Sequence, residues 1–446
     1  MQNTKKLIVM GLMLAGAAPG APAQNNLDQN IQINMASWIE TYKHFHENPE
    51  LSTQEKQTSA IVAANLRNLG YEVTEHFGQY SSPDALPYGV VGVLRNGPGP
   101  TVYVRTDMDA LPVTENTGLP YASRVRVKGT DSEVGVMHAC GHDLHMTVFL
   151  ATAKMLSEDK THWSGTVVMI GQPAEELGQG AASLLNAGLF TKFPKPDYVL
   201  ALHDSPAVPA GKVAWITGAI LAGSDSVDIT FRGYGGHGAT PQLTKDPIVI
   251  ASEFVLAVQT IVSREMNPLE PTVVTVGSFH AGTKHNIIPD EAHLQLTVRT
   301  MNPAQRTKVL SAISRMAKGI SAAAGVPEER APTIEIKNNS VATVNDAGLT
   351  QRITLSLQQA LGKDNVMTGQ PVMASEDFSL YALADPKPPT TMFWLGASDP
   401  AKWKDFTENG ARMPGLHSSE FAPVPEPAIR TGVKAMTSAV EDLLKN

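Results

Sequence analysis

The sequence predicts an α/β fold whose chain is interrupted by a second, smaller α+β domain. Strand-like apolar runs alternate with helical patterns near both ends of the chain. One run, Gly165–Gly171, is apolar throughout, as in a sheet covered on both faces by helices. Between about residues 218 and 338 the order changes to β-α-β-β-α-β, the ferredoxin-like arrangement. We therefore expect a helix-covered sheet from residues 24–217 and 339–446, with residues 218–338 inserted into it.

The first part of the larger domain opens with two helical patterns. Ile33–Phe45 and Gln54–Leu69 carry apolar residues at helical spacing, and Ser52 and Thr53 are placed to cap the second pattern. Strands follow where apolar runs are bounded by turns rich in glycine and proline. They are expected at Gly89–Leu94, Thr101–Thr106, Gly165–Gly171 and Tyr198–Leu202, with a largely apolar helix at about Asp143–Leu156.

The inserted stretch has its own alternation of strands and helices. Its strands are expected at Ser226–Arg232, Thr272–Phe279, Ala292–Thr300 and Thr333–Lys337, and its helices at Pro247–Met266 and Pro303–Ala324. The larger domain then resumes. Its last elements are expected to be a helix at Ala347–Leu361, a strand at Thr391–Leu395 and a helix at about Pro427–Leu444.

The first 23 residues have the pattern of a secretory signal. Lys5 and Lys6 precede an apolar run, Leu7–Ala18, which is too short to span a bilayer, and Ala21-Pro22-Ala23 is an A-x-A cleavage site. An uncleaved anchor is the alternative, but small residues follow the run instead of a stop-transfer pattern. We expect an exported protein, periplasmic or secreted, with no membrane association after cleavage.

Charge and cysteine content restrict the partners. Without Lys5 and Lys6, 33 of the 35 basic residues remain against 43 acidic ones, which gives a formal charge of −10. This balance argues against nucleic acid or an anionic membrane as a partner. The single cysteine, Cys140, excludes an intramolecular disulfide. An unpaired cysteine in an exported protein needs a reason, and metal ligation supplies one.

The stretch Met137–His145 holds that cysteine two residues before His142, with His138 and His145 close by. Thiolate and imidazole bind borderline-soft divalent metals such as zinc. The plainer interpretation is that Cys140 is a small buried hydrophobe. A metal site therefore requires further ligands from other parts of the chain.

Three apolar strands end on residues that bind metals or transfer protons. They end at Asp107, at the pair Glu175 and Glu176, and at His203. In open α/β sheets, sites form in the crevice at the carboxyl ends of strands, so these side chains are expected to meet. His417 lies in a later loop rich in glycine and proline, where it is expected as a further ligand.

Six motifs occur along the chain in a fixed order. They are Arg105-Thr106-Asp107-Met108-Asp109-Ala110-Leu111-Pro112, His138-Ala139-Cys140-Gly141-His142-Asp143, Glu175-Glu176, Gly235-Gly236-His237-Gly238-Ala239-Thr240-Pro241, His285-Asn286-Ile287-Ile288-Pro289-Asp290 and Ser375-Glu376-Asp377-Phe378. In this order they resemble the M20 metallopeptidase family, specifically its amidohydrolase branch, similar to hippurate hydrolase and the auxin-conjugate (IAA-amino acid) hydrolases. The resemblance covers essentially the whole mature chain.

The resemblance implies a zinc-peptidase-like catalytic domain with a mixed sheet and two divalent metal ions bridged by a water or hydroxide. It implies Glu175 as the general base. The matching metal ligands are Cys140, His142, Glu176, His203 and His417. Zn, Mn, Co and Ni all tolerate such ligands, so the identity of the metal stays open.

The resemblance also implies that the inserted domain, residues 218–338, is a lid and a dimerisation surface. Its histidine, His237, is then expected to reach the substrate in the partner subunit's site, and Asn286 and Arg299 to contact substrate. Arg299 has the planar donor fork that suits a carboxylate, but a surface charge is an equal alternative.

Four acidic residues and two histidines near these motifs lie outside the ligand set. We interpret Asp107 and Asp109 as groups that orient the ligand imidazoles, with a helix cap or turn as the alternative for Asp107. The pair Glu376 and Asp377 either supports the site or caps a helix. No role is assigned to His138 or His145.

Together these patterns predict an exported amidohydrolase that cleaves N-acyl or aryl-acyl amino acids with metal-activated water. A broader dipeptidase or aminoacylase is the main alternative, and a non-hydrolytic metal-binding homologue a remote one. Gly233–Gly238 also fits the G-x-G-x-x-G pattern of a nicotinamide-dependent oxidoreductase. Pro241 follows closely and no helix opens directly after the motif, so its context argues against that function.

Overall fold

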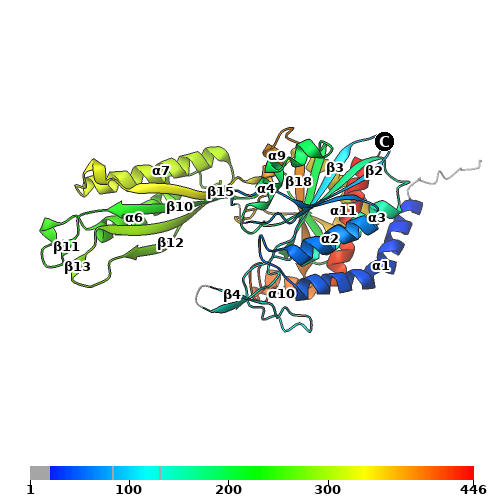
Figure 1. Cartoon of the computed structure of the whole chain (residues 1–446), viewed down its shortest axis with the longest axis horizontal. Helices are drawn as coiled ribbons and strands as arrows, with labels where there is room; N and C mark the ends of the chain where they lie inside the picture. Colours follow the sequence, from blue (N-terminus) through cyan, green and yellow to red (C-terminus); the bar gives the residue numbers. More distant parts are fainter. Residues whose placement is uncertain (1–20, 83–84, 130–131, 446) are drawn as a thin grey trace, which may run out of the picture.

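The computed structural model describes residues 21–82, 85–129 and 132–445 (Figure 1). The predicted signal segment lies outside these residues, except that Ala21–Ala23 begin helix α1 (Ala21–Glu47). The chain forms a large sheet flanked by helices and a narrower lobe that projects from it.

The large sheet has eight strands and is mixed. The central strands β6, β3, β7 and β18 are parallel to one another, whereas β1, β2 and β8 introduce antiparallel pairs. The predicted α/β class is therefore confirmed. The strands lie in the order β1 (Glu72–Phe77), β2 (Gly89–Asn96), β6 (Gly165–Gln172), β3 (Thr101–Asp107), β7 (Tyr198–Pro209), β18 (Thr390–Ser398), β8 (Val213–Trp215) and β17 (Val366–Thr368).

Helices cover both faces because alternate strand residues point to opposite sides. Val102 and Val104 face one core, and Tyr103 between them faces the other. The first core also holds α1, α2 (Lys56–Asn68), α3 (His142–Glu158), α8 (Ala347–Leu361) and α11 (Pro425–Leu443). The second holds α4 (Gly180–Asn186), α5 (Leu189–Lys192) and α9 (Ser379–Leu383).

The projecting lobe, which we call the lid, has a separate four-stranded antiparallel sheet with its own core around Phe231 and Phe254. Its strand order, β12 (Thr272–Ala281), β14 (Glu291–Thr300), β10 (Gly223–Arg232) and β15 (Thr333–Ser340), is ferredoxin-like, with helices α6 (Pro247–Thr260), η2 (Ile261–Glu265) and α7 (Pro303–Ala323). At the lid's root, β9 (Gly218–Leu221) pairs with β16 (Thr343–Asn345).

The tip of the lid is farthest from the large sheet (Figure 1). There, the two-residue strands β11 (Gly236–His237) and β13 (Ile287–Ile288) pair with each other. The exact limits of the inserted domain, residues 218–338, stay a prediction.

Two local expectations were wrong. Helix α2 begins at Lys56, and the Glu50 carboxylate accepts the backbone N–H groups of Gln57 and Thr58 in place of a cap by Ser52 or Thr53. Strand β7 does not end at Leu202 but continues to Pro209, because β18 pairs with it beyond that point.

Several short elements lacked a clear sequence signal. The hairpin β4 (Arg126–Lys128) and β5 (Glu133–Gly135) extends beneath the lid, near helix α10 (Pro400–Asn409) (Figure 1). The short 3₁₀ helices are η1 (Pro241–Leu243), η3 (Glu328–Arg330) and η4 (Lys363–Asn365).

Candidate metal centre

The strand ends meet because β6, β3 and β7 are parallel neighbours in register. Asp107 pairs with Gln172, so the chain leaves β3 and β6 at the same edge. Pairing between β3 and β7 stops at Arg105 and Ala201, which leaves His203 two residues beyond it. His203 therefore faces the crevice although it lies inside its strand.

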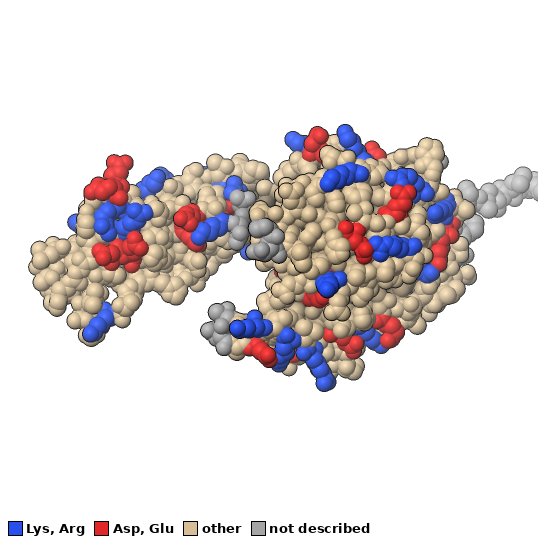
Figure 2. All heavy atoms as spheres, in the orientation of Figure 1, with Lys and Arg blue, Asp and Glu red and all other residues tan. Residues whose placement is uncertain are grey.

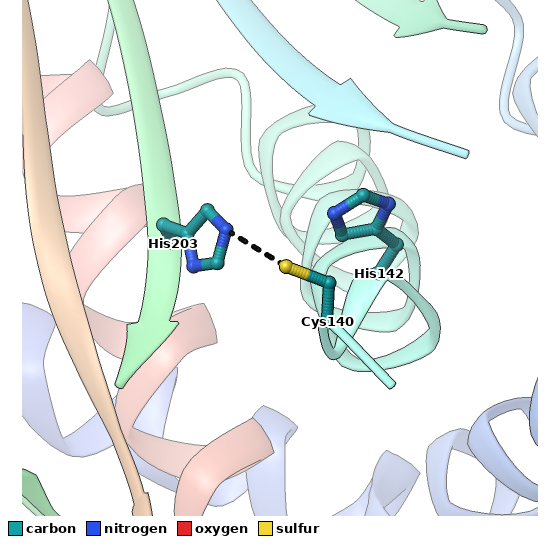
Figure 3. A group of neighbouring side chains, drawn as sticks. All are labelled: Cys140, His142 and His203. Atoms are coloured by element: carbon teal, nitrogen blue, oxygen red, sulfur yellow. Dashed lines mark hydrogen bonds between the residues drawn. The ribbon is translucent and has the colours of Figure 1, made fainter. Parts of the chain in front are cut away.

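One group of potential ligands is formed by Cys140, His142 and His203 (Figure 3), whose ligand atoms lie within 4.8 Å of one another. The Cys140 Sγ lies 3.6 Å from His203 Nε2. Gly141, between the first two, has a φ of +74° and directly precedes α3. A Cβ at this position would lie 2.6 Å from the Asp204 carboxylate, so the turn requires glycine.

A second group is formed by Cys140, Glu176 and His417. The His417 Nε2 lies 3.3 Å from Cys140 Sγ and 3.4 Å from Glu176 Oε1. His417 has a left-handed φ of +64°, and its N–H donates to the Ala139 carbonyl at 2.7 Å, which holds its loop against the cysteine turn. Cys140 thus belongs to both groups.

Backbone carbonyls orient two of the imidazoles. Nδ1–H of His142 donates to the Asp109 carbonyl at 2.7 Å, and Nδ1–H of His203 donates to the Asp204 carbonyl at 2.8 Å. Both Nε2 atoms are thereby left to face the cluster, as in metal-binding histidines. Among the described residues, His142 Nε2 and Glu176 Oε1 are buried without a hydrogen-bond partner. These orphaned atoms and the S, N and O donor set fit a divalent cation.

The electrostatics also fit a cation. Burial raises the pKa of the Cys140 thiol well above its usual value, and the Glu176 and Glu175 carboxylates raise it further. A thiolate here therefore needs nearby positive charge, which a divalent metal supplies. The surrounding carboxylates are Asp107, Asp109, Glu175, Glu176, Asp204, Glu376 and Asp377.

Arg105 is fully buried among three of these carboxylates. Its guanidinium donates to Asp107 and Glu376 at 2.7 Å each and to Asp377 at 3.2 Å. Gln172 accepts from Arg105 Nε and donates to Asp377. The Arg105 network thereby anchors Glu376 and Asp377 close to the cluster, and the two carboxylates also accept backbone N–H groups, those of Phe378 and Ala181.

Glu175 has a carboxyl oxygen 4.0 Å from His142 Nε2 and is 8% exposed. Burial, followed by Glu376 and Glu176, raises its pKa well above the usual range. Its N–H and that of Glu176 donate to the Asp109 carboxylate at 3.2 and 3.0 Å. A proton acceptor of raised pKa beside potential metal ligands has the properties of a general base.

Asp107 contacts a histidine outside the predicted ligand set. Its Oδ1 accepts from His145 Nδ1–H at 2.7 Å, and the Asp204 N–H donates to His145 Nε2 at 2.8 Å. Its Oδ2 lies 3.7 Å from His142 Nε2, on the cluster side of that ring. His145 therefore links the Asp107 carboxylate to the backbone of Asp204. His138 is buried, which lowers its pKa to about 4, and neither ring nitrogen has a partner in the described structure.

The lid residues divide between its two ends. His237 and Asn286 lie together at the tip, where the Gly238 N–H donates to the Asn286 carbonyl at 2.9 Å, far from the metal-ligand cluster (Figure 1). Arg299 lies at the root, and its Nη1 donates to Ser375 Oγ at 2.9 Å, directly before Glu376. The chain brings Arg299 close to the cluster but leaves His237 and Asn286 remote.

Sequence patterns missed a buried histidine. Both ring nitrogens of His46 donate to carboxylates, to Asp143 at 2.7 Å and to Glu115 at 3.0 Å. Burial lowers the pKa of His46, but these carboxylates outweigh burial and raise it to about 10. Since its partners are 97 and 69 residues away, spacing gave no signal for this contact.

The fold and the ligand cluster define a metal-binding hydrolase. The chain belongs to peptidase family M20/M25/M40, whose family model matches residues 103–442. It is 37% identical over 414 residues to thermostable carboxypeptidase 1 of Saccharolobus solfataricus (91% of this chain, 95% of the relative). It is 35% identical over 407 residues to N-acetyldiaminopimelate deacetylase of Limosilactobacillus fermentum (90% and 96%). It is 38% identical over 354 residues to hippurate hydrolase of Campylobacter jejuni (78% and 86%).

Two solved structures agree with this family assignment. A protein of methicillin-resistant Staphylococcus aureus described as an aminohydrolase superposes with a TM-score of 0.82 at 31% identity, covering 95% of this chain and 100% of that one. A Bacillus subtilis protein described as a dinuclear metal-binding peptidase of the M20 family has a TM-score of 0.74 at 27% identity, covering 93% and 99%. The predicted family and its hydrolytic class are confirmed.

Proposed function

We propose that the protein is an exported amidohydrolase that cleaves the amide bond of N-acyl or aryl-acyl amino acids with two divalent metals. The observation that carries this proposal is that two ligand groups share Cys140, with the Glu175 carboxyl 4.0 Å from His142 Nε2. The solved relative described as dinuclear supports two metals. The domain limits and the signal peptide predicted from the sequence belong to the same proposal.

The two ligand groups would hold the metals, one through Cys140, His142 and His203 and one through Cys140, Glu176 and His417. A divalent metal held there would lower the pKa of bound water towards about 7 and so would supply the nucleophile. Glu175 accepts the proton of that water and returns it to the leaving amine. Its raised pKa suits this role, because a strongly acidic carboxyl would bind the proton too weakly.

Arg299 recognises the carboxylate of the amino acid. It is half-buried at the lid root, and burial lowers its pKa only from the high value of an arginine, so it stays charged. Its Nη1 already reaches Ser375, beside the network that holds Glu376. The relatives are named as a carboxypeptidase, an N-acetyldiaminopimelate deacetylase and a hippurate hydrolase, which supports an amide substrate.

His237 and Asn286 act on the site of a partner subunit in a homodimer formed through the lid. Their position at the far tip supports this, since neither reaches the cluster of its own chain in this structure (Figure 1). The lid also exposes Val249 and Leu256 on α6, and β12 is an edge strand.

Helix Pro247–Glu265 is apolar and long enough to span a bilayer, but Ile250, Phe254 and Val258 pack into the lid core.

We propose a small-molecule substrate and no nucleic-acid partner. Lysines, arginines and acidic residues are interspersed on the face drawn in Figure 2, which supports this part of the proposal for that face. An open notch lies between the lid and the larger lobe on that face (Figure 2).

A substrate panel tests the proposal. Metal-depleted protein is reconstituted separately with Zn, Mn, Co or Ni and offered N-acetyl and N-benzoyl amino acids and dipeptides. We expect metal-dependent release of free amino acid, fastest from the acylated amino acids. Preference for dipeptides would favour the dipeptidase alternative, comparable rates on all acyl groups would favour a broad aminoacylase, and no hydrolysis with metals bound would favour a non-hydrolytic homologue.

A further inference from the structure

The segment Leu51–Glu55 lies against the loop that carries Glu175 and Glu176. Ser52 Oγ donates to Asp109 Oδ2 at 2.5 Å, and Leu51 forms a parallel bridge with Ala110. Glu55 Oε1 accepts the Ala174 N–H at 2.8 Å, across 119 residues of sequence. Glu55 is 0% exposed, so this contact is made without competing water.

Ala174 has a conformation that alanine rarely adopts. Its φ is +52°, in the left-handed region, and its side chain is completely buried. The Cβ of an L-residue is strained in this region, whereas glycine enters it freely. Because Ala174 directly precedes Glu175, its backbone angles decide where the Glu175 carboxyl points. Strained backbone of this kind persists only where its surroundings hold it in place.

Carboxylates hold this turn from two sides. The N–H groups of three consecutive residues, Ala174, Glu175 and Glu176, all donate to carboxylate oxygens. Glu55 takes the first, and Asp109 takes the other two. The Ala174 carbonyl in turn accepts from the N–H groups of Gln179 and Gly180, each at 3.1 Å.

We infer that Glu55 is a positioning residue for catalysis: its carboxyl holds Ala174 in the left-handed conformation that aims Glu175 at the metal-ligand cluster. The inference rests on the proposed role of Glu175 as general base. Glu55 touches neither substrate nor metal ligands in this account. Its second oxygen, Oε2, has no hydrogen-bond partner in the described structure, so Oε1 is the atom that does the positioning.

Catalysis depends steeply on the placement of a general base, since a displacement of about 1 Å can cost on the order of 100-fold in rate. Glu55→Leu removes the acceptor at similar size, and we expect kcat to fall by about 10- to 100-fold with unchanged KM and full metal occupancy. Glu55→Gln keeps a carbonyl acceptor, and we expect kcat to stay within about threefold of the wild-type value.

Replacement of Ala174 by glycine distinguishes a positioning role of Glu55 from a merely structural one. Only the positioning role predicts that this second substitution restores the kcat lost in Glu55→Leu. Glycine reaches a φ of +52° without the Cβ strain, so the turn no longer depends on the Glu55 acceptor. In Glu55→Leu/Ala174→Gly we therefore expect kcat to recover most of the loss, measured against Ala174→Gly alone. Leu66→Ala, a buried truncation on helix α2, which begins directly after Glu55, is the matched control for lowered stability.

The outcomes separate this inference from the proposed function. Glu175→Ala is assayed in parallel, and activity in that variant would overturn the proposed function itself. If Glu175→Ala is inactive but Glu55→Leu has the wild-type kcat, only the role of Glu55 is overturned. The same conclusion follows if Glu55→Leu has a low kcat that the added Ala174→Gly substitution does not restore. If Glu55→Leu does not fold, Glu55→Ala takes its place, alone and combined with Ala174→Gly. A double variant that does not fold, or whose kcat does not recover, would also contradict the inference.

Discussion

The metal-ligand cluster and the lid tip differ in how completely one chain assembles them. Residues from four separated stretches, around Cys140, Glu176, His203 and His417, meet within one crevice because parallel strands end at one edge. At the lid tip, His237 and Asn286 lie beside each other but remote from that crevice (Figure 1). One chain therefore assembles the whole metal-ligand cluster, whereas its lid tip stays remote from that cluster, which is the arrangement that the proposed action across subunits requires.

The largest expected effect comes from the proton acceptor in the cluster. Glu175→Ala should abolish turnover and retain the metals, because Glu176 and the other ligands stay in place. Activity and metal content by elemental analysis are measured on the same sample. Retention of more than about a few per cent of activity would remove Glu175 from the role of base.

The shared position of Cys140 predicts a contrast between two ligand variants. Cys140→Ala removes a donor from both ligand groups, whereas His417→Ala removes one from a single group. We expect Cys140→Ala to lower the occupancy of both metals and His417→Ala to lower mainly one. Equal losses in the two variants would show that Cys140 does not bridge the groups.

Action of the lid across subunits can be tested by mixing two inactive variants. His237→Ala lacks the lid histidine, and Glu175→Ala lacks the base. In a mixed dimer, one site combines an intact Glu175 with the partner's intact lid, so random reassortment should recover about a quarter of wild-type activity. Mixtures that stay inactive, or a His237→Ala enzyme of normal rate, would contradict action across subunits.

The smallest effect concerns stability, and it comes from His46 behind the cluster. Its pKa is raised from 6.5 to about 10 in the folded protein. A raised folded-state pKa contributes stability that is full below pH 6.5 and is lost as pH rises through about 10. The difference in unfolding free energy between wild type and His46→Gln should therefore shrink from pH 6 towards pH 10.

Urea unfolding at several pH values measures that difference. Met35→Ala, a buried truncation on the same helix α1, is the control, since it removes no titrating group. A His46→Gln difference that does not change with pH would show that the buried ring is not charged in the folded protein.

The sequence predicted elements with strong periodicity and missed those that depend on distant partners. The lid's helices and strands carry regular apolar spacing, and their order was found from it. Strand β7 was ended too early at Leu202 because Asp204 and Pro206 interrupt the apolar run, whereas pairing with β18 continues past them. Short elements such as β4, β5 and α10 have too few apolar residues for a periodic signal.

For the candidate site too, the sequence predicted the residues that carry a motif or end a strand, and it missed contacts between distant residues. Motif resemblance pointed to the residues that meet at the crevice, and strand ends pointed independently to Glu175, Glu176 and His203. The contacts of His46, Ser52 and Glu55 could not be predicted, because each spans a long stretch of sequence and uses residue types that usually lie at the surface.

Metal titration of the metal-depleted protein, followed by activity, tests the proposed two-metal site. Hydrolysis of an N-acyl amino acid is followed as Zn or Mn is added in known equivalents. Because Cys140 joins two ligand groups, the account predicts that activity rises to a plateau at about two equivalents per chain. A plateau at one equivalent, or hydrolysis that does not depend on metal, would contradict it.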